Sequence, residues 1–552
     1  DLGRFSLDNM EVISLYNGQK SAIFQPAKDY SSASAIYMQT RKPLFKGEKK
    51  NNLNIGVKGG SFSTINPSLL WEHRFNERIS SSISTEYMYT SGRYKFTYAK
   101  KDGYDTTAVR QNGDVRMLRL ENAFFGKVPK GEWKAKAYLY NSERGYPGAA
   151  VREEPGKFRH QDRQWDTNLF VQGSFQNYFK PWYSLLANGK YAYDYLHYLS
   201  DPRLDVTTMY VDNHYRQQEI YASAAHLFTI YPWWRMSLSN DFQWNALRAD
   251  LIDFVYPTRN TILTSAATSF DFNRLMLQAS LLYTHIDDNT RTKGANAGTK
   301  NKYTPSVIAT WQPLTKLPLN VRAFYKKVFR MPTLNDLYYT FIGNKDLKPE
   351  YTTQYDVGIT FSHTWNNHWL KSLDLQIDGY YNEVDDKIIA MPTSNQFRWT
   401  MINLGHVEIR GLDAAIRGEW GFGKVELSTL FNYTYQKAQD FTDPTSEWYG
   451  GQIPYIPWHG GSIILNGSYQ TWSCNYSFIY TGERYEAVAN IPENYAQPWY
   501  THDFSLSKTF QWGKTGIRVT AEINNIFNQQ YEVVQCYPMP GTSFKIKLNV
   551  ML

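Results

Sequence analysis

Apolar and polar residues alternate along most of the chain, so the hydrophobic pattern has a period of two. Apolar side chains recur at every second position from Phe544 to Leu552, and the same alternation runs through 132–139, 425–436 and 517–527. Successive side chains of a β-strand point to opposite faces, which gives this period, whereas helical spacing is hard to find here. The sequence therefore predicts an all-β protein.

The connections between the predicted strands fall into two classes. One class is short and turn-like, as at 76–78, 129–131 and 512–514, and the other is long and polar, as at 93–113, 142–161 and 385–403. Short turns at one end and long loops at the other are typical of an outer-membrane β-barrel. Counting strands between the connections predicts a 22-stranded antiparallel transmembrane barrel, and an even count permits closure.

Composition supports the barrel over a soluble β protein. The chain has 552 residues, of which 16% are aromatic, yet its mean hydropathy is −0.54. Two faces of opposite polarity average to such a value, and interfacial girdles supply aromatic residues. Tryptophans accordingly lie beside the short turns. A soluble protein of this many strands would need a solenoid or propeller, and no fixed-period repeat is present.

Charge, cysteine content and motifs bring in no further chemistry. The net charge is +8 with no run of five basic residues, which indicates no nucleic-acid partner, and the two cysteines form no framework. No nucleophile-elbow, HExxH or phosphate-loop motif occurs in a suitable context. We therefore predict a protein that is not an enzyme, with no cofactor and no catalytic residues.

Residues 10–42 depart from the barrel pattern. The runs Met10–Gly18 and Ser34–Pro43 resemble the last two strands of the plug of a TonB-dependent outer-membrane receptor. The family's usual Gly-Gly before the final strand is replaced by Ala33-Ser34-Ala35. The resemblance implies that 1–43 is the C-terminal part of a plug domain and 44–552 the barrel, with further plug residues and a TonB box upstream.

Barrel motifs resemble the same family in the same order. The run from Phe329 to Tyr338 fits "F-R-x-P-x-x-x-D-L-Y", and the run from Gly343 to Glu350 fits "G-N-x-x-L-K-P-E". Tyr455-Ile456-Pro457-Trp458-His459 resembles a third family motif. The resemblance implies a bacterial outer-membrane importer that binds its solute between loops and plug and is driven by the TonB complex through the plug.

Within the family, Tyr140–Gly148 and the plug tail are most similar to vitamin B12 (cobalamin) receptors that work with a surface lipoprotein. This implies a corrinoid ligand and a lipoprotein lid over the extracellular loops, with lipid and lipopolysaccharide around the barrel. An importer of a ferric siderophore, haem or a glycan is the alternative. A passive porin or adhesive barrel is a further one, although a porin has no reason to carry a plug tail.

Candidate ligand-binding residues lie in the long loops. Tyr and Trp offer rigid amphipathic contact area, and Arg pairs with phosphate or carboxylate. Loop packing or lipopolysaccharide contact is the alternative reading for each. Asp287 and Asp288 are calcium candidates, with a solvated loop tip as the alternative. The binding candidates are Arg144, Tyr146, Arg152, Tyr338, Tyr339, Trp399, Trp448, Tyr449, Tyr455 and Tyr495.

Overall fold

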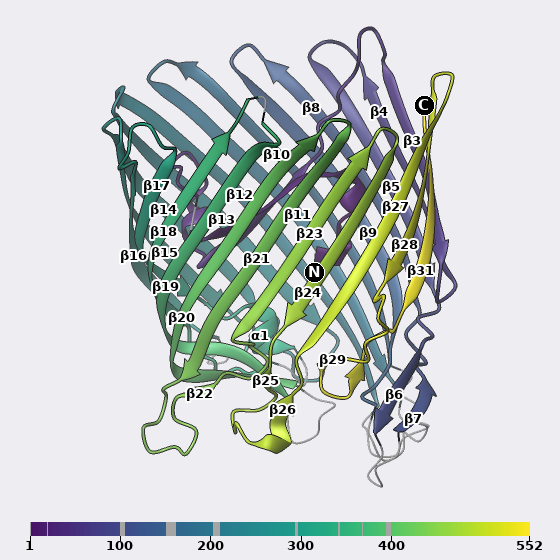
Figure 1. Cartoon of the computed structure of the whole chain (residues 1–552). Helices are drawn as coiled ribbons and strands as arrows, with labels where there is room; N and C mark the ends of the chain where they lie inside the picture. Colours follow the sequence, from purple (N-terminus) through teal and green to yellow (C-terminus); the bar gives the residue numbers. More distant parts are fainter. Residues whose placement is uncertain are drawn as a thin grey trace.

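The computed structural model describes residues 2–18, 20–99, 105–150, 162–201, 210–292, 296–339, 343–366, 368–392 and 399–552. Their main feature is a closed antiparallel barrel of 22 strands, as the alternation predicted (Figure 1). Its strands are β3 (Asn51–Gly60), β4 (Thr64–Arg74), β5 (Ile79–Thr90), β8 (Val115–Val128), β9 (Gly131–Tyr146), β10 (Asp162–Lys180), β11 (Tyr183–Ser200), β12 (Val211–Tyr231), β13 (Trp234–Ala249), β14 (Thr258–Asp271), β15 (Leu275–Asn289), β16 (Thr299–Trp311), β17 (Leu319–Arg330), β18 (Glu350–Thr364), β19 (Leu370–Pro392), β20 (Trp399–Phe422), β21 (Val425–Asp440), β23 (His459–Tyr469), β24 (Trp472–Thr481), β27 (Trp499–Trp512), β28 (Thr515–Asn524) and β31 (Ser543–Met551).

The barrel closes between its first and last strands. Strand β31 pairs with β28 on one side and with β3 on the other, in a register from Asn54↔Met551 to Gly60↔Lys545. The two backbones approach closely at Gly60, where a Cβ atom would lie 2.2 Å from the carbonyl oxygen of Phe544. Closure leaves no unpaired strand edge. A sheet that spans a membrane must be closed in this way, because lipid offers no hydrogen bonds to the backbone.

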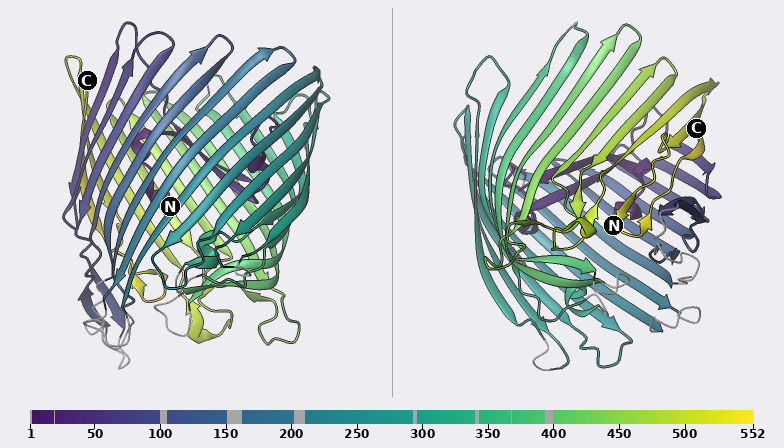
Figure 2. Two further views of the ribbon diagram at one scale, coloured as in Figure 1. Left: turned by 180° about the vertical axis from the view of Figure 1, so that it is seen from behind. Right: turned by 60° about the horizontal axis from the view of Figure 1, so that its bottom comes forward.

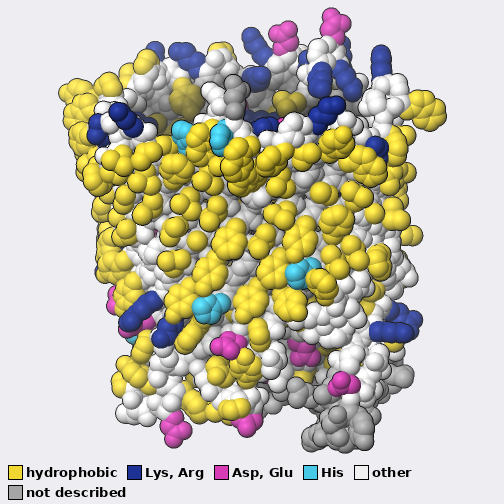
Figure 3. Space-filling model, in the orientation of Figure 1, with side chains coloured by type: hydrophobic (Ala, Val, Ile, Leu, Met, Phe, Trp, Pro, Cys, Tyr) yellow, Lys and Arg dark blue, Asp and Glu magenta, His cyan; other side chains and the backbone are white. Residues whose placement is uncertain are grey.

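The outer surface carries a continuous apolar belt. In Figure 3 hydrophobic side chains cover the middle of the barrel wall, and charged side chains gather above and below them. The belt includes Val171, Val357 and Ile546, which are 52%, 60% and 62% exposed. A soluble protein rarely exposes such an area, so this face is the one that lipid covers.

Aromatic rings form the predicted girdle beside the short turns. Tyr231 and Trp233 stack with ring centroids 5.5 Å apart, and Trp233 lies 5.9 Å from Phe272 across the next turn. Trp369 and Trp420 stack at 5.2 Å. Amphipathic rings of this kind favour the membrane interface. No helix among the described residues is long and apolar enough to cross a membrane.

The long loops at the opposite end contain small elements of their own. The helix α1 (Leu334–Tyr338) begins with a capping box, in which the Thr333 side chain accepts from the Asp336 backbone and the Asp336 side chain accepts from the Thr333 backbone. Short strands form the hairpins β6–β7, β25–β26 and β29–β30. The short strand β22 pairs with the loop end of β21 at the rim of the barrel. Their bounds are β6 (Lys95–Ala99), β7 (Asp105–Val109), β22 (Gly451–Gln452), β25 (Arg484–Tyr485), β26 (Tyr495–Ala496), β29 (Glu532–Val534) and β30 (Tyr537–Pro538).

Several predicted loop bounds were too wide. The region 385–403 was predicted as loop, yet β19 continues to Pro392 and β20 begins at Trp399. Likewise β9 runs on to Tyr146. The antiparallel ladder needs only backbone partners, so it extends past the apolar belt into polar sequence.

Residues 2–18 and 20–43 lie inside the barrel (Figure 2, dark purple). They form η1 (Leu2–Arg4), η2 (Leu7–Asn9), β1 (Met10–Asn17), η3 (Ala27–Tyr30) and β2 (Ser34–Thr40). Strands β1 and β2 pair antiparallel with each other, at the positions that the plug resemblance indicated. We call these residues the luminal segment.

Polar contacts fix the luminal segment to many strands of the wall. The carboxylate of Asp241 accepts from the backbone N–H groups of Ala27 and Lys28, at 3.0 and 2.8 Å. The ammonium of Lys326, which is 1% exposed, donates to the carbonyl oxygens of Gly18 and Ser32, at 3.1 and 2.7 Å. A small hydrophobic cluster, in which Ile23, Ala27 and Tyr30 pack against Leu263, Ala267 and Leu282, adds to these polar contacts.

Candidate binding site

A charged cluster joins the luminal segment to the barrel wall near the loop end. Asp166 of β10 is 1% exposed, and its carboxylate lies 3.5 Å from the guanidinium of Arg144 on β9 and 3.8 Å from that of Arg4 in η1. Strand pairing places Ser142 opposite Asp166, so alternate residues of β9 face the same point. We call Arg4, Tyr140, Ser142, Arg144 and Asp166 the Arg144–Asp166 cluster.

Hydrogen bonds hold the guanidinium of Arg144 in place. It donates to the hydroxyl of Tyr140 at 3.0 Å and to that of Ser142 at 3.2 Å. Its Nε atom is buried and has no hydrogen-bond partner among the described residues. Both guanidiniums lie beside the one carboxylate of Asp166. A buried donor without an acceptor costs about 1–3 kcal/mol, and an incoming anion relieves that cost.

Tyrosine rings adjoin this cluster. Tyr146, which is 39% exposed, packs edge to face with Tyr198 at 6.4 Å. Tyr339 lies on Tyr215 at 4.4 Å and interacts electrostatically with Asp166 and Arg4. Burial, and then the neighbouring Tyr215, raise the pKa of the Tyr339 hydroxyl, which therefore stays neutral at physiological pH. The structure thus brings the predicted residues Arg144, Tyr146 and Tyr339 into one region.

A second group of aromatic rings lies at the rim of the barrel, and we call Trp399, Tyr455, Tyr485 and Tyr495 the rim cluster. The ring of Trp399 is 6.0 Å from that of Tyr455, whose backbone N–H donates to the carbonyl of Tyr485 at 2.8 Å. The rings of Tyr485 and Tyr495 meet edge to face at 5.9 Å. Burial, and then Glu486, raise the pKa of Tyr455 to about 12. Three separate loop regions therefore present one aromatic surface.

Other predicted residues lie elsewhere. Tyr338 is 7% exposed and packs in a hydrophobic core with Leu334 and Leu337, so it supports α1. Tyr449 meets Phe441 edge to face at 5.1 Å in the same loop as Trp448, apart from the rim cluster. Arg152 lies outside the described residues.

The calcium candidates do not converge on one point. Both carboxylate oxygens of Asp288 accept from Arg259, at 2.6 and 2.7 Å. Asp287 is the next residue of β15, so its side chain points to the other face of the sheet, where Thr299 donates to it at 2.9 Å.

A cavity of about 620 Å³ lies between the luminal segment and strands β8 to β12. Lysines line it, and the wall lysines are matched by acidic partners: Lys136 lies 2.9 Å from Glu121, and Lys190 lies 3.0 Å from Glu219. These two wall lysines are therefore neutralised by acidic neighbours.

Sequence reasoning missed Arg4, Tyr140 and Asp166 as site residues. Tyr140 begins the run whose resemblance was noted, and Asp166 belongs to an alternating strand, so both carried a weak signal. Arg4 reaches the cluster only because the luminal segment folds back along the wall, where its carbonyl accepts from the hydroxyl of Tyr138. The whole region thus combines charged groups with aromatic rings.

Comparisons with known proteins agree with this architecture. A family model described as "TonB dependent receptor-like, beta-barrel" matches residues 68–526. The vitamin B12 transporter BtuB of Photobacterium profundum is 28% identical over 244 residues, which cover 43% of this chain and 36% of that protein. BtuB of Vibrio vulnificus is 31% identical over 207 residues, covering 37% and 29%. The matched region thus spans about a third of the length of these curated relatives.

Solved structures share the fold. The copper transporter OprC superposes with a TM-score of 0.74 at 14% identity, over 98% of this chain and 85% of that one. Receptors titled as iron and siderophore transporters superpose equally well at 12% identity. Likeness at this identity extends to the fold alone. The matched family is one of receptors and not of enzymes. Since its model covers most of the barrel, the chain belongs to the TonB-dependent receptors and lies in the bacterial outer membrane.

Proposed function

We propose that this protein imports a scarce large solute, of the vitamin B12 (corrinoid) class, across the outer membrane. The observation that carries the proposal is the Arg144–Asp166 cluster, which the barrel wall and the luminal segment build together. A solute that binds there touches both parts, so binding changes the contacts of the segment that we interpret as the end of the plug. This is the coupling that an energised importer needs.

The character of the site supports a large amphipathic solute with an anionic group. The guanidinium groups of the cluster suit a phosphate or carboxylate. The rings of Tyr146, Tyr339 and the rim cluster suit an extended apolar or planar body. The BtuB relatives favour a corrinoid among such solutes. A ferric siderophore is the second candidate, because an anionic ferric chelate also fits two guanidiniums.

A passive porin fits these observations less well. The luminal segment lies across the lumen and is anchored to the wall through Asp241 on β13 and Lys326 on β17. We propose that the TonB complex acts on the plug to release it. We also propose a surface lipoprotein as a lid over the loops, with lipid and lipopolysaccharide around the apolar belt.

Uptake of radiolabelled cyanocobalamin tests the proposal in cells. We expect a strain that lacks its own corrinoid receptor to accumulate the label when it makes the full-length protein, and accumulation to stop when TonB is inactivated. Accumulation that is unaffected by loss of TonB would instead indicate a passive pore.

A further inference from the structure

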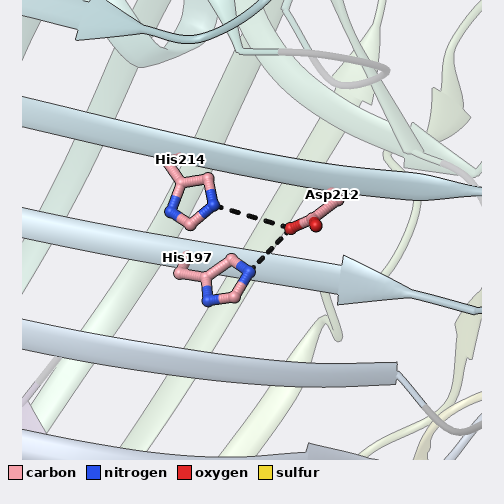
Figure 4. A group of neighbouring side chains, drawn as sticks. All are labelled: His197, Asp212 and His214. Atoms are coloured by element: carbon pink, nitrogen blue, oxygen red, sulfur yellow. Dashed lines mark hydrogen bonds and ion pairs between the residues drawn. The ribbon is translucent and has the colours of Figure 1, made fainter.

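The outer face of the barrel carries a cluster of metal-binding side chains near the loop end. His197 on β11 pairs directly with His214 on β12, and Asp212 lies two residues from His214 on the same face (Figure 4). Side chains directly opposite each other in an antiparallel pair have Cβ atoms about 5 Å apart, close enough to share a ligand. Their nitrogen and oxygen atoms all lie within 4.8 Å of one another.

The cluster faces outward. On β11 the residues of opposite parity, such as Leu196, pack toward the core inside the loop end, and on β12 so does Tyr215. The parity of His197 is that of Tyr191, which is 40% exposed, and the parity of His214 is that of Ile220, which is 44% exposed. The cluster is therefore separate from the luminal binding region and needs its own explanation.

Neighbouring groups orient both imidazoles toward the carboxylate. The Nε2 atom of His197 lies 2.7 Å from Oδ1 of Asp212, and that of His214 lies 3.6 Å from the same oxygen. Trp165 stacks on His197 at 4.5 Å, and the hydroxyl of Tyr195 lies 2.6 Å from Nδ1 of His214. A partner on the far ring nitrogen fixes the tautomer and orientation of a metal-binding histidine.

A fourth possible ligand, a carboxylate, lies next to the cluster. Asp250, just after β13, accepts from the backbone N–H of His214 at 2.8 Å, and its Oδ2 lies 3.8 Å from Nε2 of His214. The side chains of His197, Asp212 and His214 are 22%, 41% and 33% exposed, so an ion can enter from solvent. Two imidazoles with carboxylate suit zinc or copper, whereas calcium and magnesium prefer oxygen ligands alone.

We propose that His197, Asp212 and His214 bind one divalent transition-metal ion, Zn²⁺ or Cu²⁺, with Asp250 as an additional or water-mediated ligand. The ion links β11 to β12 at the rim of the barrel. It displaces the hydrogen bond between His197 and Asp212, and both imidazoles bind through Nε2 while Nδ1 of His214 donates to Tyr195.

Titration calorimetry with zinc chloride and with copper sulfate, on untagged full-length protein in chelator-free detergent, tests this site. We expect one ion per chain, and no such binding in the double variant His197→Ala, His214→Ala. Asp212→Asn should also weaken binding. Tyr195→Phe should weaken binding by about 10–100-fold, because it removes only the orienting hydrogen bond.

His226→Asn is the matched control. His226 lies on the same face of β12 and has a tyrosine partner, Tyr183, at 3.0 Å, but it lies outside the metal-binding group. We expect this variant to bind metal as the unmodified protein does. Heat-modifiable migration on gels verifies that each variant has a folded barrel. Absence of binding at micromolar metal, or equal binding by a folded double variant, would overturn the proposal.

Discussion

Replacing Lys326 by Met will release the luminal segment from the wall while leaving the barrel closed. Lys326 is buried, and its ammonium donates to the carbonyl oxygens of Gly18 and Ser32. Met keeps an unbranched side chain of similar length but donates nothing, so the carbonyls of Gly18 and Ser32 lose a charged partner. At about 1.5–3 kcal/mol for each charged hydrogen bond, the open population of the segment rises by at least about a hundredfold.

Limited proteolysis in detergent measures this release. We expect cleavage between residues 18 and 33 to become much faster in Lys326→Met, with an unchanged heat-modifiable band for the barrel. Lys327→Met is the matched control, since Lys327 is the next residue, is exposed and points to the opposite face. Equal protection of the segment in Lys326→Met and the unmodified protein would contradict the anchoring role.

Replacing Arg144 by Gln will weaken corrinoid binding about 10–100-fold, because it removes one charge-assisted contact of about 1.5–3 kcal/mol. Gln carries no charge for an anionic group to pair with, yet it can still donate to Tyr140 or Ser142. Fluorescence quenching by cyanocobalamin gives the dissociation constant of each variant.

Arg163→Gln serves as the control for this variant. Arg163 adjoins the same strands but pairs on the outer side with Asp114 at 2.9 Å and with Glu143 at 2.5 Å. We expect it to bind the corrinoid normally. If Arg144→Gln and the unmodified protein have the same dissociation constant, the Arg144–Asp166 cluster is not the ligand site.

Local sequence predicted the barrel because the feature that defines it is local. Each strand alternates between lipid and lumen, so segments such as 425–436 reveal their own faces, and the aromatic residues beside short turns mark one interface. The ends of the strands were harder to predict. Polar residues around Asp385 and Asn403 continue the ladder of β19 and β20, because backbone pairing does not depend on apolar side chains.

The candidate site was predictable only in part, because it depends on contacts between distant residues. Trp399, Tyr455 and Tyr495 do come together, yet Tyr338 packs into the core with no local signal to separate it from them. The contact of Arg4 with Asp166 requires the luminal segment to lie against one side of the wall. Neither the alternation of apolar and polar residues nor any motif predicts which side of the wall the luminal segment contacts.

The metal cluster shows the same limitation. His197 and His214 become neighbours only through the register of β11 and β12, across a long connection. A shift of one residue in that register would no longer place His197 opposite His214. The two imidazoles would then lie on opposite faces of the sheet. Nothing in the local sequence indicates that these side chains lie next to one another.

Titration calorimetry of the full-length purified receptor, with cyanocobalamin in one experiment and a ferric siderophore in another, tests the central proposal most directly. We predict saturable binding of cyanocobalamin with a dissociation constant in the micromolar range or tighter, and much weaker binding of the siderophore. Binding of the ferric siderophore alone, with no heat from cyanocobalamin at micromolar concentration, would contradict the assignment of a corrinoid as the solute.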